Sequence, residues 1–457
     1  MRGAGRLPRH VLRERAVPDS IPFPLPAAPA GRHDSPLLVG LSGGLDSSVL
    51  LHRLAADAER RARGLRALHV HHGLHRDAEA WAKHCAQLCT SLGIGLDIVR
   101  VAVLRDGGEG LEAAARRARH AAFESALGEG EVLVLAHHRD DQAETFLLRA
   151  LRASGVDGLA AIRPWRRCGR GWLWRPLLGL PRSALLAYAQ AHALAWIDDP
   201  SNDDSAHDRN FIRHQVMPAL QARWPHAGDA FARASALQAE AAELLSDEDH
   251  VALSSVRTID PHCLHVDHLS ALDTARRARV LRLWLSSLGL PPMPAVGIAR
   301  IERDLLGDGR GEAPAFAWRN AAVRRWRDLL WAGTPTPALP GGFRENWNGE
   351  VPFALPEGGS LRFIGAPVAH PSATSVTPPF VVHARNGGER IRLPGRGHRH
   401  ALKHVLQDLG VPPWVRARLP LLSSRDGELL AAGNLVFSAG FDTWLRTGGL
   451  RLAWDIA

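Results

Sequence analysis

Short apolar runs alternate with longer amphipathic segments from about residue 36 to residue 152. The apolar runs, rich in Leu and Val, predict buried strands at 37–41, 66–71, 96–103 and 132–136. The segments that follow them repeat apolar residues at helical spacing and predict helices at 47–61, 77–92, 110–127 and 141–152. This alternation indicates an α/β fold, in which a parallel doubly wound sheet carries helices on both faces. Ligands of such sheets bind beyond the carboxyl ends of the strands.

The pattern changes after residue 225. A helical stretch is expected at 227–245, the segment 334–342 (TPTPALPGG) has the composition of a linker, and glycine turns at 358–359 and 387–388 favour strands. Closely spaced prolines before residue 30 predict a disordered N-terminus. We therefore expect five parts: an Arg/Pro-rich tail (1–34), a nucleotide-binding catalytic domain (35–225), a mainly helical middle domain (226–333), a linker with strands (334–378) and a small α+β C-terminal domain (379–457).

A glycine- and serine-rich loop follows the first predicted strand and consists of Ser42, Gly43, Gly44, Leu45, Asp46, Ser47 and Ser48. Two glycines allow a tight turn, so that backbone amides and serine hydroxyls can face a phosphate at the positive end of the next helix. A glycine turn with ordinary helix capping is the alternative. The lysine-containing phosphate loop of kinases and GTPases is absent from the sequence.

Two histidine clusters follow other predicted strands. His71 ends the second strand, and His137 begins a run that contains Asp140, Asp141 and Glu144. Asp140 and Glu144 lie four residues apart at a helix start, so both can face Mg²⁺ bound to ATP phosphates. A helix cap, a strand-end histidine and a surface charge are the ordinary interpretations of these residues. Because three polar clusters lie at one edge of the sheet, we expect a nucleotide site there.

Composition and charge narrow the choice of partners. The net charge is +9, with 56 basic against 47 acidic residues, which favours a polyanionic partner. Four scattered cysteines are too few for a disulfide framework and indicate a cytoplasmic protein, with Cys85 and Cys89 as core thiols. No apolar run approaches the ~20 residues of a membrane span, so no membrane partner is expected.

The loop at 42–48 resembles the signature of the PP-loop ATP pyrophosphatases, whose members split ATP between its α and β phosphates. The whole motif order resembles tRNA(Ile)-lysidine synthetase in particular: S-G-G-x-D-S at 42–47, H-H-G at 71–73, E-A-x-A-R at 112–116, H-x-x-D-D-Q-x-E-T at 137–145, R-P-L-L at 175–178, and D-x-S-N at 199–202 with R-N at 209–210. A family C-terminal segment is matched at 411–416, whereas 247–380 matches weakly.

The resemblance implies a two-step reaction on the wobble cytidine of an isoleucine tRNA with a CAU anticodon. ATP adenylates the C2 oxygen and releases pyrophosphate, and free L-lysine then displaces AMP to form lysidine, which changes decoding from AUG to AUA. ATP and Mg²⁺ are the implied cofactors, and the middle and C-terminal domains are expected to contact tRNA. The oligomeric state stays open.

The resemblance also assigns roles to residues. Asp46, Asp141, Glu144 and Arg209 are expected to be catalytic. Mg²⁺ is expected on Asp46, Asp140 and Glu144. The nucleotide is expected to contact the loop 42–48 together with His71, Arg116 and His137.

Two rival functions remain to be weighed. A PP-loop thiolase that makes 2-thiocytidine would need cysteine pairs, and the sequence has no C-x-x-C. A catalytically silent nucleotide- or RNA-binding protein would have little use for Asp46, Asp140, Asp141 and Glu144, because carboxylates beside phosphates repel unless a metal intervenes. The C-terminal domain carries histidine and arginine at 395–400, so we expect RNA affinity to rise below about pH 6.5 as imidazoles become charged.

Overall fold

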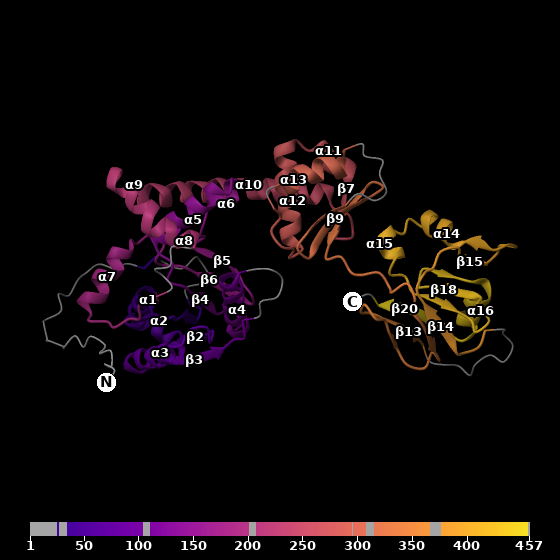
Figure 1. Cartoon of the computed structure of the whole chain (residues 1–457), viewed down its shortest axis with the longest axis horizontal. Helices are drawn as coiled ribbons and strands as arrows, with labels where there is room; N and C mark the ends of the chain where they lie inside the picture. The colour runs from indigo at the N-terminus through magenta and orange to yellow at the C-terminus, as the bar shows by residue number, and fades with distance from the viewer. Residues whose placement is uncertain are drawn as a thin grey trace, which may run out of the picture. The chain divides into compact units, whose positions relative to one another are not determined.

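The computed structural model describes residues 25–26, 34–103, 110–200, 207–294, 296–307, 315–365 and 376–455. The chain forms two compact units, residues 1–247 and 248–457, whose elements are labelled in Figure 1. Almost all of the predicted tail lies outside the described residues, as do residues 201–206, which include Ser201 and Asn202 of the predicted D-x-S-N motif. The finer division into five parts stays a prediction.

A six-stranded sheet forms the centre of the first unit, in the order β3-β2-β1-β4-β6-β5. Its first five strands pair in parallel, and β5 pairs antiparallel with β6 at the edge. The doubly wound parallel sheet is therefore confirmed. The strands are β1 (Leu37–Gly40), β2 (Leu65–His71), β3 (Gly95–Arg100), β4 (Val132–Val134), β5 (Trp165–Cys168) and β6 (Gly171–Trp174).

Helices cover both faces of this sheet. On one face Leu50, Cys85 and Leu185 pack from α1, α3 and α7, and on the other Phe123 packs from α4. The helices are α1 (Leu45–Ala55), α2 (Ala58–Ala62), α3 (Ala78–Leu92), α4 (Leu111–Ala126), α5 (Arg139–Leu151), α6 (Val156–Leu159), α7 (Arg182–Ala191), α8 (Asp208–Phe211), the π-helix η2 (Ile212–Val216) and α9 (Met217–Arg223). Cys85 and Cys89 are buried in this core, as predicted, and burial raises the pKa of their thiols to about 12 and about 11.

Local details differ from the predictions for physical reasons. The single helix expected at 47–61 is two helices, because the side chain of Asp57 accepts a hydrogen bond from the amide of Arg60 and starts α2. Strands β5 and β6 were not predicted. Arg166 and Arg167 interrupt the apolar pattern of β5, which an edge strand tolerates because one of its sides is unpaired.

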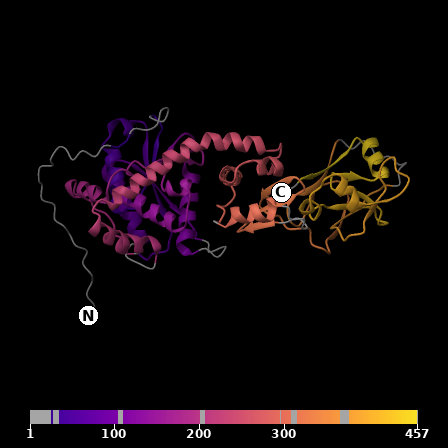
Figure 2. The same ribbon diagram turned by 90° about the horizontal axis from the view of Figure 1, so that it is seen from above.

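One long helix, α10 (Ala227–Val256), runs without a break from the end of the first unit into the beginning of the second (Figure 2). The sequence predicted its start and placed its end about three turns too early. Leu253 and Val256 at its C-terminal end pack in the core of the second unit. None of the helices in the described parts of the chain is long and apolar enough to cross a membrane.

The first part of the second unit, which is the middle of the chain, combines helices with a four-stranded antiparallel sheet in the order β7-β10-β9-β8. The sequence predicted mainly helix here. The hairpin turns were missed because Arg319 and Arg327, and not glycines, adopt positive φ angles of 46° and 56°. The elements are β7 (Cys263–His265), α11 (Val266–Ala271), α12 (Thr274–Ser287), α13 (Gly297–Arg300), the π-helix η3 (Ile301–Leu306), β8 (Ala315–Trp318), β9 (Ala321–Trp326) and β10 (Leu329–Gly333).

The C-terminal part is an α+β module, as predicted. Its sheets have the orders β11-β14-β17-β18-β19, β12-β13-β20 and β15-β16. The elements are β11 (Arg344–Trp347), β12 (Phe353–Ala354), β13 (Ser360–Ile364), β14 (Phe380–His383), β15 (Arg390–Ile391), β16 (His400–Ala401), α14 (Leu402–Asp408), α15 (Pro413–Arg416), β17 (Leu421–Ser423), β18 (Leu429–Ala432), β19 (Val436–Phe437), α16 (Ala439–Thr447) and β20 (Arg451–Asp455).

Candidate active site

The glycine- and serine-rich loop turns tightly between β1 and α1. Ser47 Oγ accepts a hydrogen bond from the amide of Ser42 at 3.2 Å and donates to the carbonyl of Gly44 at 3.1 Å. The hydroxyls of Ser42 and Ser47 lie 3.0 Å apart. Gly44 is the N-cap of α1 and has no side-chain cap. The loop therefore presents uncapped amides at a helix N-terminus, where an anion binds favourably.

Gly43 lies at a position where a side chain would not fit. Its φ angle is +84°, and a Cβ atom there would lie 2.8 Å from Ile197 Cδ1 and 3.0 Å from Cys85 Sγ. The carbonyl of Gly43 accepts a hydrogen bond from the amide of Ile197 at 2.9 Å. The loop is thus held from one side by α3 and from the other by the segment that follows α7.

A cavity of about 440 Å³ lies beyond the carboxyl ends of β1, β2 and β4. The cavity lies at the edge of the sheet where the rule for parallel sheets predicts a ligand. Residues from all three predicted polar clusters line the cavity, among them Ser42, Asp46, Ser47, His72, His137 and Asp141. Two residues of the loop, Gly43 and Ser48, do not line the cavity, and the side chain of Ser48 is buried.

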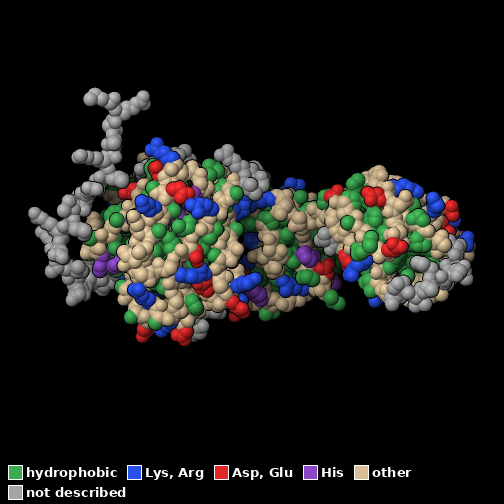
Figure 3. All heavy atoms as spheres, turned by 90° about the horizontal axis from the view of Figure 1, so that it is seen from below, with side chains coloured by type: hydrophobic (Ala, Val, Ile, Leu, Met, Phe, Trp, Pro, Cys, Tyr) green, Lys and Arg blue, Asp and Glu red, His purple; other side chains and the backbone are tan. Residues whose placement is uncertain are grey.

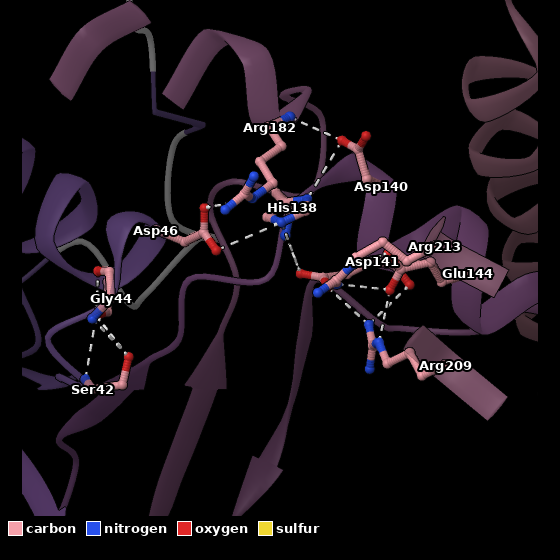
Figure 4. Close-up of polar contacts among 11 residues, drawn as sticks. Ser42, Gly44, Asp46, His138, Asp140, Asp141, Glu144, Arg182, Arg209 and Arg213 are labelled. Atoms are coloured by element: carbon pink, nitrogen blue, oxygen red, sulfur yellow. Dashed lines mark hydrogen bonds and ion pairs between the residues drawn. The ribbon is translucent and has the colours of Figure 1, made fainter. Parts of the chain in front are cut away.

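His138 connects the loop to the acidic start of α5. Its Nε2 lies 3.7 Å from Asp46 Oδ2 and 3.5 Å from Asp141 Oδ2, and its Nδ1 lies 3.5 Å from Asp140 Oδ2 (Figure 4). Burial lowers the pKa of His138, but the contact with Asp140 and the charges of Asp141 and Asp46 raise it more, so the net pKa is above the ordinary value. For Asp46, burial outweighs the nearby cations and raises the pKa.

Glu144 is bound by two arginines. Arg209 Nε donates to Glu144 Oε2 at 2.7 Å, and Arg213 Nε donates to Glu144 Oε1 at 2.6 Å. Both arginines also reach Asp141 Oδ1, at 2.9 Å from Arg209 and 3.3 Å from Arg213 (Figure 4). The Glu144 side chain is only 2% exposed. Two buried carboxylates are thus balanced by two arginines from the turn of chain at α8 and η2.

Two arginines and a histidine from α4 line another wall of the cavity. Arg116, Arg119 and His120 border the cavity, and within the described ranges neither Arg116 nor Arg119 forms an ion pair. Burial together with the charges of Arg116 and Arg119 lowers the pKa of His120 to about 4. An uncompensated basic wall of this kind favours a negatively charged ligand.

Comparisons with known proteins identify the family. The chain matches the family model of the PP-loop domain at residues 24–220, of the TilS substrate binding domain at 264–331 and of the TilS substrate C-terminal domain at 380–454. It is 53% identical to the tRNA(Ile)-lysidine synthase of Xanthomonas axonopodis pv. citri over 95% of this chain and 96% of the relative. It is 49% identical to the protein of the same name from Xylella fastidiosa (strain 9a5c) over 95% of this chain and 98% of the relative.

The chain belongs to the tRNA(Ile)-lysidine synthase family. The resemblance inferred from the motifs is thereby confirmed. The match extends through the middle of the chain, where the motifs alone were weak, because whole-domain similarity does not depend on short polar signatures.

The nucleotide contacts predicted from the sequence are distributed unevenly. Arg116, His137 and five of the seven loop residues line the cavity, whereas Gly43, Ser48 and His71 do not. His71 Nε2 lies 3.3 Å from Glu79 Oε1 of α3, and the next residue, His72, borders the cavity in its place. Neighbouring residues of a strand point to opposite faces, so the motif H-H-G cannot by itself tell which histidine faces the ligand.

Two of the three carboxylates predicted to bind Mg²⁺, those of Glu144 and Asp140, have other partners in the protein. Glu144 is saturated by Arg209 and Arg213, and Asp140 accepts a hydrogen bond from the amide of Arg182 at 2.8 Å. Burial opposes ionisation of Asp140, but His138 and this amide lower its pKa to about 2. Within the parts of the chain that the structure describes, no group of three His, Cys, Asp or Glu residues is arranged to hold a metal.

Two residues of the site, His138 and Arg182, were not singled out from the sequence. Arg175 begins the R-P-L-L motif but had no predicted role, and Arg213 shares a helix face with Arg209, a spacing that lets the two bind one carboxylate together. The signal for His138 was its place two residues before Asp140, where it is the N-cap of α5. Arg182, whose Nε lies 3.9 Å from Asp46 Oδ1, had no signal in the sequence beyond its charge.

Proposed function

We propose that this protein adenylates the C2 oxygen of the wobble cytidine in a tRNA(Ile) with a CAU anticodon and then joins lysine to that carbon. The observation that carries the proposal is that the glycine- and serine-rich loop, the basic wall and Asp141 line one cavity, and that Asp141 shares two arginines with the buried Glu144. Family membership over 95% of the chain supports the same activity. The two rival functions, thiolation and silent binding, have no observation in their favour.

The first step uses the loop side of the cavity. The amides at Gly44 and the hydroxyls of Ser42 and Ser47 bind the phosphates of ATP, and Arg116 compensates their charge. Asp46 fits a magnesium-bound triphosphate, because its Oδ1 is buried without a hydrogen bond among the described residues. When bound there, Mg²⁺ would neutralise charge on the phosphates. The cytidine oxygen then attacks the α phosphorus and pyrophosphate leaves.

The second step uses the Asp141–Glu144 side. Lysine brings an amine, which suits the carboxylate of Asp141 at the cavity. Glu144 can bind the amine only by exchanging a contact with Arg209 or Arg213, and an arginine released in this way suits the carboxylate of lysine. The amine attacks C2 and AMP leaves with the oxygen, so one C–N bond forms, one C–O bond breaks and the amine loses a proton. No covalent intermediate with the enzyme is needed. This agrees with the raised pKa of the buried Cys85 and Cys89, which makes their thiols poor nucleophiles.

The tRNA is expected to contact more than the cavity. Basic and acidic side chains are interspersed on the face of the protein that Figure 3 shows, so RNA binding on this face would depend on local groups and not on one uniformly basic surface. The middle and C-terminal domains match substrate-domain models and are the proposed tRNA-contacting parts. The cytoplasmic location stays a prediction that agrees with the unpaired cysteines of the described residues.

The test of this function is a reconstituted reaction with unmodified tRNA(Ile), ATP, Mg²⁺ and radiolabelled lysine. We expect pyrophosphate release to require tRNA, AMP to appear only after lysine is added, and the label to enter the tRNA. As a control, the wobble cytidine of the tRNA(Ile) is replaced by another base. Label that enters this altered tRNA would contradict the proposal. A product with sulfur at C2 would indicate a thiolase, and nucleotide binding without turnover would indicate a silent binder.

The affinity of the C-terminal domain for tRNA is expected to depend on pH. The rings of His398 and His400 lie 4.3 Å apart. Desolvation and the charges of His398, Arg396 and Arg390 lower the pKa of His400, so it becomes charged only below the ordinary value of about 6.5. We therefore expect tRNA affinity to increase about 2- to 5-fold between about pH 7 and about pH 5.5, the range of one or two weak surface ion pairs.

The measurement is a tRNA-binding titration across this pH range at constant salt. The double variant His398→Gln with His400→Gln is expected to remove the increase and to leave affinity at about pH 8 unchanged. Equal affinities of the unaltered protein at both ends of the range would contradict the prediction.

A further inference from the structure

Arg175 is a buried arginine with an unusual set of partners. It follows β6, is 8% exposed, and pairs with no carboxylate among the described residues. Its Nη1 donates to the carbonyl of Arg163 at 2.7 Å, and its Nε donates to Nδ1 of His137 at 3.2 Å. Burial and the charges of Arg166 and Arg116 lower its pKa to about 10, so it stays charged near neutral pH. A buried charge without a counter-ion is costly, and this indicates that its contacts matter.

The contact with Arg175 determines which nitrogen of His137 carries a proton. A guanidinium group only donates hydrogen bonds, so Nδ1 of His137 must accept. A neutral imidazole that accepts at Nδ1 carries its proton on Nε2. His137 borders the cavity, and its Nε2 forms no hydrogen bond with the residues that the structure describes. The N–H is therefore available to a ligand.

Charged groups from four elements surround this imidazole and keep it neutral. Burial is the largest influence on its pKa; the charge of Asp141 from α5 opposes it, and the charges of Arg175, Arg209 and Arg116 add to it. The result is a pKa of about 3 for His137. The side chain therefore donates a hydrogen bond in the same way from weakly acidic to basic conditions.

We propose that Arg175 is a positioning residue that holds His137 as the Nε2-protonated tautomer, and that this N–H donates to an acceptor oxygen of a bound substrate. The inference rests on the proposed function, in which two such oxygens enter the cavity: a phosphate oxygen of ATP and the C2 oxygen of cytidine. Both accept from a neutral donor. Arginines on the α4 wall already supply positive charge, so His137 contributes direction without adding to it.

The tautomer is tested first, by NMR of the full-length protein labelled with ¹⁵N in histidine. The signals of His137 are assigned as those absent from His137→Gln. We expect one neutral, Nε2-protonated form from about pH 5 to about pH 8, a span that brackets the ordinary imidazole pKa. In Arg175→Met the two neutral tautomers should mix. Arg166→Met removes a neighbouring cation but not the hydrogen bond, and should resemble the unaltered protein.

Binding of the two substrates is tested separately. Arg175→Met is expected to weaken either ATP, measured without tRNA, or tRNA, measured without ATP, by about 3- to 10-fold, the range of one neutral hydrogen bond. The substrate that is affected is the one that supplies the acceptor oxygen. Thermal unfolding shows whether Arg175→Met is folded, and His137→Gln against His137→Leu repeats the comparison without touching Arg175. The glutamine amide can donate from near the position of Nε2, so His137→Gln should retain more affinity than His137→Leu.

Three outcomes would overturn the inference: a proton on Nδ1 in the unaltered protein, titration of His137 near its ordinary pKa, or unchanged affinity for both substrates in folded Arg175→Met. Failure of the proposed function is distinguishable from these. If the unaltered protein forms no lysidine while His137 shows the expected tautomer, the reaction assignment fails and the positioning role of Arg175 stands.

Discussion

Replacing Asp46 with Asn is expected to reduce tRNA-dependent pyrophosphate release by roughly 100-fold or more, the scale of losing one preorganised electrostatic contact. Asp46 lines the cavity beside Ser47, and its Oδ1 is buried without a hydrogen bond among the described residues. Asn keeps the shape and removes the charge. Stopped-time assays of pyrophosphate release with saturating tRNA measure the effect.

Asp140→Asn is the matched control. Asp140 contacts the same histidine, His138, but its carboxylate accepts from the amide of Arg182 and does not line the cavity. We expect its effect to stay within about 10-fold, the low end of the effects of a residue that only orients others. Equal losses in the two variants would mean that the charge of the cluster, and not the position of Asp46, controls the first step.

Replacing Glu144 with Ala is expected to abolish lysine incorporation and to lower the free energy of unfolding by about 3–5 kcal/mol. Both carboxylate oxygens of Glu144 are bound by Arg209 and Arg213, and the side chain is 2% exposed. Removing it leaves two arginines with only Asp141 to balance them. Urea titration measures the stability change, and label transfer from lysine to tRNA measures the reaction.

Two comparisons separate the catalytic role from the structural one. Glu243→Ala breaks an ion pair with Arg163 in which the glutamate is 78% exposed, so its cost should stay below about 1 kcal/mol. Glu144→Gln keeps the shape of the side chain and should still lose lysine incorporation at a temperature where it is folded. Near-normal incorporation by folded Glu144→Gln would show that the carboxylate holds the arginines and does not act on lysine.

The sequence by itself determined the elements that depend on local pattern. Runs of Leu and Val predicted β1, β2 and β4, because parallel strands buried on both faces need continuous apolar residues; β3 was also predicted, although it is a largely exposed edge strand. The loop at 42–48 and the acidic start of α5 were predicted because glycine and Asp or Glu act through neighbouring residues in the chain. Their common location followed from the rule that parallel strands share one carboxyl edge.

Only the tertiary structure decided which side chains meet. Glu144 finds Arg209 and Arg213 about 65 residues away, and His137 finds Arg175 in the segment after β6. Burial then decides which carboxylates remain for a ligand: Glu144 and Asp140 are engaged, whereas Asp46 Oδ1 accepts no hydrogen bond among the described residues and has Arg182 Nε at 3.9 Å. Spacing along the chain predicts which residues lie on the same face of a helix or strand. Pairing and desolvation depend on distances between elements that no local pattern contains.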